Sequence, residues 1–389
     1  MSVDIRPFKI DVPLEEVERM KRKLRDTRLP KNPIVPEAGE DYAGPSMDWT
    51  HRLYNKYLDF DWPAAQDHLN RHNHYIASIP DENTSVDIHF THTPSPSPDG
   101  IPLILIHGWP GSFAEFDRVV DCFANPPSSD MPSFHVVVPN IPGFMWSSPP
   151  HRKGWTLQDT ARLYHKLMLS LGYSAYVAQA GDWGMFIARE LGAKYPACEA
   201  VHLNFCPTPL PEDLKDSDLT EREKMVNDRC DDWLDDHLGY AVCMRSRPHT
   251  VGVGFIDHPV GIMMWVGEKF NELANPDNQD EKWEQIILTQ VCLYHFSGCM
   301  MTAMLPYYEN VKHAGFGEFV LKEENRIKCP MGYTSFKYDS RPGTKRGVER
   351  SGNLVFYNES DHGGHFAALE CPDVLLADCR KFFDEHFTR

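Results

Sequence analysis

Short apolar runs that alternate with helical patterns constrain the fold of this chain more than any other feature. Between residues 101 and 205 the sequence contains four such runs, IPLILI (101–106), HVVVP (135–139), YVAQA (176–180) and VHLNF (201–205). Helical patterns lie between them at 157–171 and 185–195. Strands that alternate with helices form parallel sheets with helices on both faces. The sequence therefore predicts an α/β fold with a mostly parallel central sheet.

This pattern is preceded and interrupted by segments of a different character. Ahead of it, apolar residues at 14, 17, 20 and 24 follow Pro13 at helical spacing, which predicts an amphipathic helix over 14–26. After residue 207 the chain becomes acidic and polar and then helical, which we interpret as an inserted cap. The expected segments are an N-terminal arm packed on the core (1–92), the first part of the core (93–207), the helical cap (208–322) and the second part of the core (323–389).

Composition and charge exclude several classes of function. The chain has a net charge of −17 and no Lys/Arg block long enough to follow a phosphate backbone, so nucleic acid is not an expected partner. No apolar run approaches the roughly 20 residues that span a bilayer, and the charged N-terminus does not resemble a secretory signal. The ten cysteines include no CxxC pair of the kind that binds zinc. We therefore expect a cytoplasmic protein without a membrane anchor. A homodimer is one of the assemblies that the sequence leaves open.

The motif AGDWG (180–184) lies between a strand-like run and a helical pattern. Small residues at its first and fifth positions are typical of a sharp strand-to-helix turn that presents the central residue at the carboxyl edge of the sheet. That residue is usually Ser, but here it is Asp182. A carboxylate can form an ester by attacking a saturated carbon, so the motif predicts a nucleophile for displacement at carbon. The alternative is that Asp182 only caps the following helix.

A second motif, HGWPGS (107–112), directly follows the run IPLILI. A glycine-rich loop at this position can direct a backbone N–H toward the nucleophile. We expect the N–H groups of Trp109 and Trp183 to form an oxyanion hole for a tetrahedral intermediate.

A general base is expected near the C-terminus, where DHGGHF (361–366) follows the run LVFY. His365 stands on a glycine-rich loop that can reach the sheet edge, and it would activate the water that cleaves the ester; His362 is a weaker candidate. The orienting acid should lie between the nucleophile and the base in chain order. Asp339 fits that position, with Glu359 and Asp361 as alternatives.

Taken in this order, HGWPGS, AGDWG and GGHFAALE resemble the epoxide hydrolases of the microsomal type, and FKIDVPLEEVERMKRKLRDTRLP resembles that family's N-terminal extension. The resemblance covers nearly the whole chain and implies an α/β-hydrolase fold, as in soluble fungal members without a membrane anchor. It places the nucleophile on Asp182, the histidine on His365 and the acid on Asp339. It also implies that water converts an epoxide into a vicinal diol, and that no metal or organic cofactor is needed.

The same resemblance implies two tyrosines that hold the epoxide oxygen. The segment GYAVCMRSRPHTVG is similar to the one with the first tyrosine, and LPYYEN is similar to the one with the second. They correspond to Tyr240 and Tyr307, with Tyr308 as the neighbouring alternative. A phenol of pKa about 10 is a suitable hydrogen-bond donor to a developing alkoxide.

Three other functions are compatible with parts of this pattern. A haloalkane dehalogenase shares the Asp turn, a biosynthetic cyclase could open an epoxide with an internal nucleophile, and a non-catalytic binding protein could share the fold. The paired tyrosines favour an epoxide over a halide. The histidine argues against the cyclase, and the complete set of catalytic groups argues against a binding protein. The identity of the epoxide, the enantiopreference and a role in detoxification or biosynthesis stay open.

Overall fold

The computed structural model describes residues 3–35, 43–278 and 280–388. In these residues nine strands form one sheet in the order β1-β2-β3-β5-β4-β6-β7-β8-β9. The strands are β1 (Asp4–Phe8), β2 (His74–Asp81), β3 (Thr84–Thr93), β4 (Ile101–Ile106), β5 (Phe134–Pro139), β6 (Tyr176–Ala180), β7 (Cys198–Leu203), β8 (Ile327–Phe336) and β9 (Gly352–Ser360). All pairs from β5 to β9 are parallel, whereas β1, β2 and β3 add an antiparallel edge. The prediction of a mostly parallel α/β sheet is confirmed.

Helices cover both faces of this sheet. On β7, the side chain of Val201 lies next to Gly192 of α6 (Asp182–Lys194). The next residue, His202, faces Phe382 and Phe383 of α16 (Pro372–His386). Because successive side chains of a strand point to opposite faces, α6 and α16 lie on opposite sides of the sheet. The remaining helices between β4 and β7 are α4 (Val120–Ala124) and α5 (Leu157–Ser170), and after β8 they are α14 (Lys345–Val348) and α15 (Ala367–Glu370).

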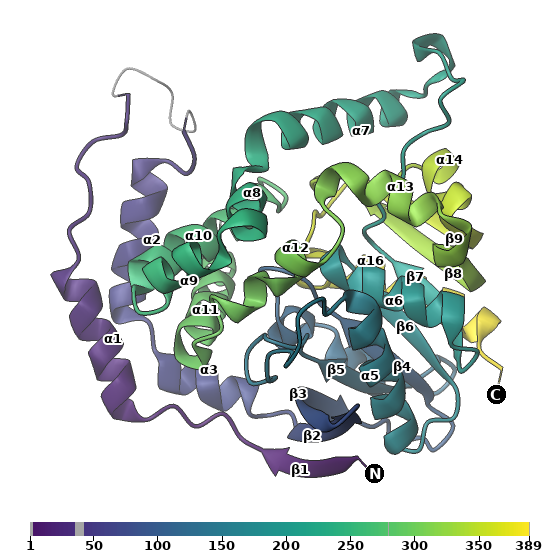
Figure 1. Cartoon of the computed structure of the whole chain (residues 1–389), viewed down its shortest axis with the longest axis horizontal. Helices are drawn as coiled ribbons and strands as arrows, with labels where there is room; N and C mark the ends of the chain where they lie inside the picture. The colour runs from purple at the N-terminus through teal and green to yellow at the C-terminus, as the bar shows by residue number, and fades with distance from the viewer. Residues whose placement is uncertain (1–2, 36–42, 279, 389) are drawn as a thin grey trace.

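A helical segment lies between β7 and β8 (Figure 1). Its helices are α7 (Glu221–Asp232), α8 (Gly239–Ser246), α9 (Pro248–Phe255), α10 (Pro259–Glu272), α11 (Glu281–Ser297), α12 (Leu305–Glu309) and α13 (Phe316–Leu321). A Thr220–Glu223 capping box begins α7, and Gly298 in the left-handed conformation ends α11. Among the described residues, no single helix is both long enough and apolar enough to cross a membrane. Within these residues, only α11 and the segment Thr302–Glu309 together reach the required length and hydropathy, and the chain bends by 112° between them.

The N-terminal residues contribute to both parts of the molecule. The predicted helix is α1 (Leu14–Asp26), and α2 (Met47–Asp59) and α3 (Trp62–Leu69) follow it. Figure 1 shows these helices beside α9, α10 and α11, away from the parallel strands. Ion pairs connect the two groups, such as Arg19 to Asp257 at 2.6 Å and Arg52 to Glu284 at 2.7 Å. The same N-terminal region supplies β1 to β3 of the sheet.

Candidate active site

Asp182 lies at the turn between β6 and α6, with a backbone φ of 43°. A non-glycine residue rarely adopts this left-handed conformation, and such strain is typical of a nucleophile held at a sharp turn. Gly184 has to be small, because a Cβ there would collide with the carbonyl oxygen of Ile106. A Cβ on Gly108 would collide with the carboxylate of Asp182 itself. The two glycine-rich motifs therefore fit against each other at the carboxyl ends of β4 and β6.

The backbone N–H of Trp109 donates a hydrogen bond to Asp182 Oδ1 at 2.7 Å. Trp183 is the next residue after Asp182, in the first turn of α6, where backbone N–H groups have no partner within the helix. Asp182 Oδ2 faces the other way and lies 3.4 Å from His365 Nε2. The two carboxylate oxygens thus have different neighbours, a backbone donor for Oδ1 and the imidazole for Oδ2.

His365 connects Asp182 to Asp339. Its Nδ1 lies 2.6 Å from Asp339 Oδ1, and both residues are buried. The alternative acids lie elsewhere. Asp361 is exposed and pairs with Arg222 at 3.5 Å, and the exposed Glu359 accepts a hydrogen bond from the Tyr357 hydroxyl. His362 is also exposed, so His365 is the histidine that the fold brings to Asp182.

The charges around His365 determine its protonation in the free protein. Burial by itself lowers the pKa of His365, but the carboxylates of Asp339 and Asp182 outweigh it and hold the pKa well above 6.5. The backbone N–H of His365 donates to the carbonyl of Leu273 at 3.0 Å, just after α10. The loop that holds the imidazole is therefore attached to the helical segment as well as to the sheet.

Tyr240 of α8 and Tyr307 of α12 pack against the two tryptophans of the predicted oxyanion hole. The Tyr240 ring stacks on Trp109 at 5.3 Å between centroids, and the Tyr307 ring meets Trp183 edge-on at 4.8 Å. The two phenol rings are 5.9 Å apart. Burial and the nearby charge of Asp182 raise the pKa of Tyr240, and burial raises that of Tyr307 well above 10, so both are neutral donors. Tyr308, in contrast, is 48% exposed.

A small enclosed cavity of about 10 Å³ lies at Asp182 and His365, with room for about one water. Tyr240 and Trp183 also line it, together with residues that the sequence did not single out: Phe186, Phe205, Trp233, Leu273, His313, Phe316, Ser340 and Arg341. Most of these are apolar or aromatic, and four of the eight come from the helical segment: Trp233, Leu273, His313 and Phe316. Their aromatic spacing gives no sequence signal of a site, whereas Arg341 could have been noticed because it follows Asp339 by two residues.

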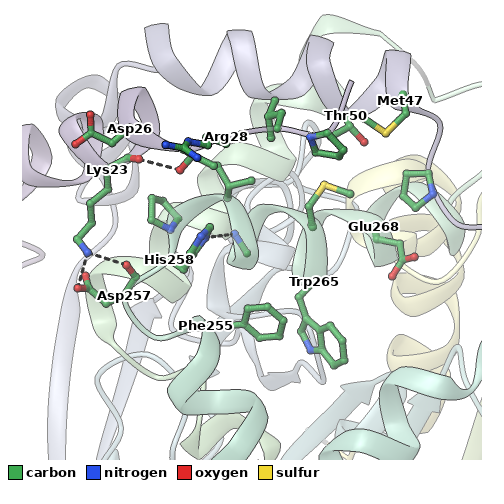
Figure 2. Close-up of a pocket in the computed structure, with 18 of the residues that line it drawn as sticks. Lys23, Asp26, Arg28, Met47, Thr50, Phe255, Asp257, His258, Trp265 and Glu268 are labelled. Carbon is green, nitrogen blue, oxygen red and sulfur yellow. Dashed lines mark hydrogen bonds and ion pairs between the residues drawn. The ribbon is translucent and has the colours of Figure 1, made fainter. Parts of the chain in front are cut away.

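Two larger cavities lie nearby in the molecule. One, of about 1210 Å³, reaches Tyr240 from the side of Trp49 and Lys269 and so approaches the enclosed cavity. The other, of about 820 Å³, lies between the N-terminal helices and α9 and α10 (Figure 2). Its wall includes Trp265 and the ion pair of Lys23 with Asp257, but none of the predicted site residues. This second cavity therefore lies apart from Asp182.

Comparisons with known proteins agree with this geometry. The family model "Epoxide hydrolase N terminus" matches residues 5–116, and "alpha/beta hydrolase fold" matches residues 101–212. A relative from Stigmatella aurantiaca (strain DW4/3-1), named "Putative epoxide hydrolase", is 31% identical and covers 97% of this chain and 84% of its own length. Epoxide hydrolase 1 of Oryctolagus cuniculus is 29% identical, with coverages of 97% and 88%.

Solved structures give the same result. The structure of Aspergillus niger epoxide hydrolase matches with a TM-score of 0.89 and 31% identity, covering 99% of this chain and 97% of that one. The juvenile hormone epoxide hydrolase of Bombyx mori, 24% identical, shares the fold with a TM-score of 0.86. On these likenesses over nearly its whole length, the chain belongs to the epoxide hydrolase family of the α/β-hydrolase fold.

Proposed function

We propose that this protein converts an epoxide into a vicinal diol through a covalent ester on Asp182. The supporting observation is a single arrangement: a strained carboxylate with a buried His–Asp pair on one side, and the buried Tyr307 and half-buried Tyr240 close by. In this proposal the helical segment 208–322 acts as the cap, and the cavity that reaches Tyr240 is the route of entry. Because the inner cavity holds only about one water, aromatic side chains must move when substrate enters.

In the first step, Asp182 Oδ2 attacks one carbon of the ring, and the carbon–oxygen bond breaks. Tyr240 and Tyr307 donate hydrogen bonds to the epoxide oxygen, and one of them supplies the proton that the alkoxide needs. Trp109 N–H stays on Oδ1, which becomes the carbonyl oxygen of the ester. The step needs no base, because Asp182 reacts as the ionised carboxylate.

Ester formation then prepares His365 for the second step. Two carboxylates raise the pKa of His365 in the free protein, and the ester removes the charge of one of them. His365 therefore gives up its proton more readily, which restores the phenol, and it becomes a base. It deprotonates a water that attacks the ester carbonyl, while the N–H groups of Trp109 and Trp183 stabilise the oxyanion. Collapse releases the diol and regenerates Asp182, with no net gain or loss of protons.

Isotope labelling tests the covalent route. A single turnover of styrene oxide in oxygen-18 water, with enzyme in excess, should place the label in the Asp182 carboxylate, as read by peptide mass. A label found in the diol, with Asp182 unlabelled, would mean that water attacks the epoxide directly. A companion variant, His365→Gln, should accumulate the alkyl-enzyme, and its absence there would contradict the two-step assignment.

Dehalogenation is a second candidate reaction for the same nucleophile. The indole N–H of Trp109 is buried without a hydrogen-bond partner in the described structure, and an indole N–H suits a halide ion. The phenol pair and the similarity to epoxide hydrolases favour the epoxide. Incubation with 1-bromobutane and measurement of released bromide distinguishes the two, because the proposed function predicts release no faster than without enzyme.

A further inference from the structure

The inner cavity has a cationic side chain that the proposed mechanism does not use. Arg341 lines the cavity together with Asp182, His365 and Tyr240. It lies in the loop after β8, two residues beyond Asp339. The loop that holds Asp339 therefore also brings a guanidinium to the cavity.

Arg341 has no anionic partner among the residues that the structure describes. Its Nε and Nη1 are buried and have no hydrogen-bond partner, and it forms no ion pair within 4.0 Å with a described carboxylate. A buried charge is costly unless it is paired, so an unpaired guanidinium at a cavity calls for a partner from outside the chain.

Other cations act on the same end of the cavity. His313 also lines the cavity, and its pKa is lowered to about 4. Burial is the largest cause, and the charge of Arg341 is the second, to which Arg245 and Lys312 add by lowering the same pKa. Arg245 forms no ion pair with a described carboxylate, and Lys312 donates to the carbonyl oxygens of Tyr307 and Tyr308. His313 is neutral near pH 7 and adds no charge at this end. Glu309 acts on Lys312 with the opposite charge, and Asp182 is the carboxylate that opposes the three cations at His313.

We infer that the substrate is an epoxide that bears a carboxylate, which Arg341 binds while Tyr240 and Tyr307 hold the ring oxygen. This inference rests on the proposed function and names its substrate class. A carboxylate matches the charge and the planar donors of a guanidinium, and its own charge would otherwise be repelled by Asp182. The aromatic side chains that also line the cavity, and that must move when substrate enters, would contact the rest of the molecule.

A pair of epoxides of matched shape tests the inference. trans-3-Phenylglycidate carries a carboxylate where trans-β-methylstyrene oxide carries a methyl group. We expect the wild-type protein to hydrolyse the glycidate with the higher kcat/KM. Arg341→Gln should lower kcat/KM about 10- to 100-fold more for the glycidate than for the neutral epoxide, as expected for loss of a charge-assisted hydrogen bond. Arg341→Lys should restore part of that difference, because it keeps the charge.

Arg247→Gln is the matched control. It removes the same charge from an exposed position in the helical segment, where Arg247 donates only to the carbonyl of Ser246 among described groups. It should leave the ratio of the two kcat/KM values unchanged. If Arg341→Gln lowers both epoxides equally, or if the wild-type protein favours the neutral epoxide, Arg341 does not recognise a substrate carboxylate.

Inhibition gives a measurement that does not depend on a stable variant. 3-Phenylpropanoate should inhibit wild-type hydrolysis of styrene oxide competitively and at least about 10-fold more strongly than 3-phenylpropanamide. Equal inhibition by the acid and the amide would overturn the inference while leaving the proposed function intact. If no epoxide is hydrolysed and no ester forms on Asp182, the proposed function fails as well.

Discussion

Replacing Asp339 by Asn should slow hydrolysis of the Asp182 ester by about 100-fold and leave ring opening within about threefold of the wild-type rate. The amide removes the negative charge that lies 2.6 Å from His365 Nδ1 but keeps the shape of the side chain. A hydrogen bond to a charged group contributes roughly 1.5–3 kcal/mol, which corresponds to about 10- to 150-fold in rate. The upper limit for the slowing of ester hydrolysis is the complete loss of general-base catalysis, which would be about 10²- to 10⁴-fold. Ring opening is spared because it requires the ionised Asp182 and the phenols rather than a base.

Rapid mixing with excess styrene oxide, followed by quenching and intact-protein mass measurement, separates the two steps. The variant should show a fast rise of alkyl-enzyme to nearly one equivalent and then a slow steady state. Glu359→Gln is the matched control, since Glu359 also precedes His365 in sequence but is exposed and away from it. It should leave both steps unchanged. If Glu359→Gln slows hydrolysis as much as Asp339→Asn, or if Asp339→Asn slows both steps equally, the role given to Asp339 is wrong.

Three further predictions follow from the same geometry. Tyr240→Phe and Tyr307→Phe should each lower the single-turnover rate of ring opening by about 10- to 1000-fold, whereas Tyr308→Phe should not, since Tyr308 is 48% exposed; equal effects of all three would contradict the assignment. Gly184→Val should lower the free energy of unfolding, measured in urea, by roughly 3 kcal/mol or more, because the new side chain would collide with the carbonyl end of β4. A smaller decrease in the free energy of unfolding would show that the turn can relax. Burial raises the pKa of Glu115 from 4.5 to about 8, so the folded protein keeps a proton that the unfolded chain releases, and stability falls as the pH rises through that interval. Glu115→Gln should therefore gain at least ~1 kcal/mol over wild type at pH 9 and nothing at pH 4, and a pH-independent difference would refute the shift.

Much of the fold could be predicted because it depends on local patterns. The helix at 14–26 and the four strand-like runs were recognisable from spacing and residue type. The antiparallel edge strands β1 to β3 were not recognised. β1 is mostly exposed, and the pairing of the three strands with each other and with β5 depends on contacts that the sequence does not display.

The sequence by itself determined the turn that presents Asp182, because a strand-to-helix turn with small residues on both sides is a local feature that a few adjacent residues specify. Only the tertiary structure decided which partners surround it. It placed Asp339 rather than Glu359 or Asp361 against His365, and it buried Tyr307 rather than Tyr308. Tyr307 and Tyr308 differ because neighbouring residues on a helix point about 100° apart. Asp339 and His365 meet because the packing of the sheet and helices determines which loops lie close together. Arg341 became visible for the same reason, since the lack of an ion pair with a described carboxylate can be judged only when its neighbours are in place.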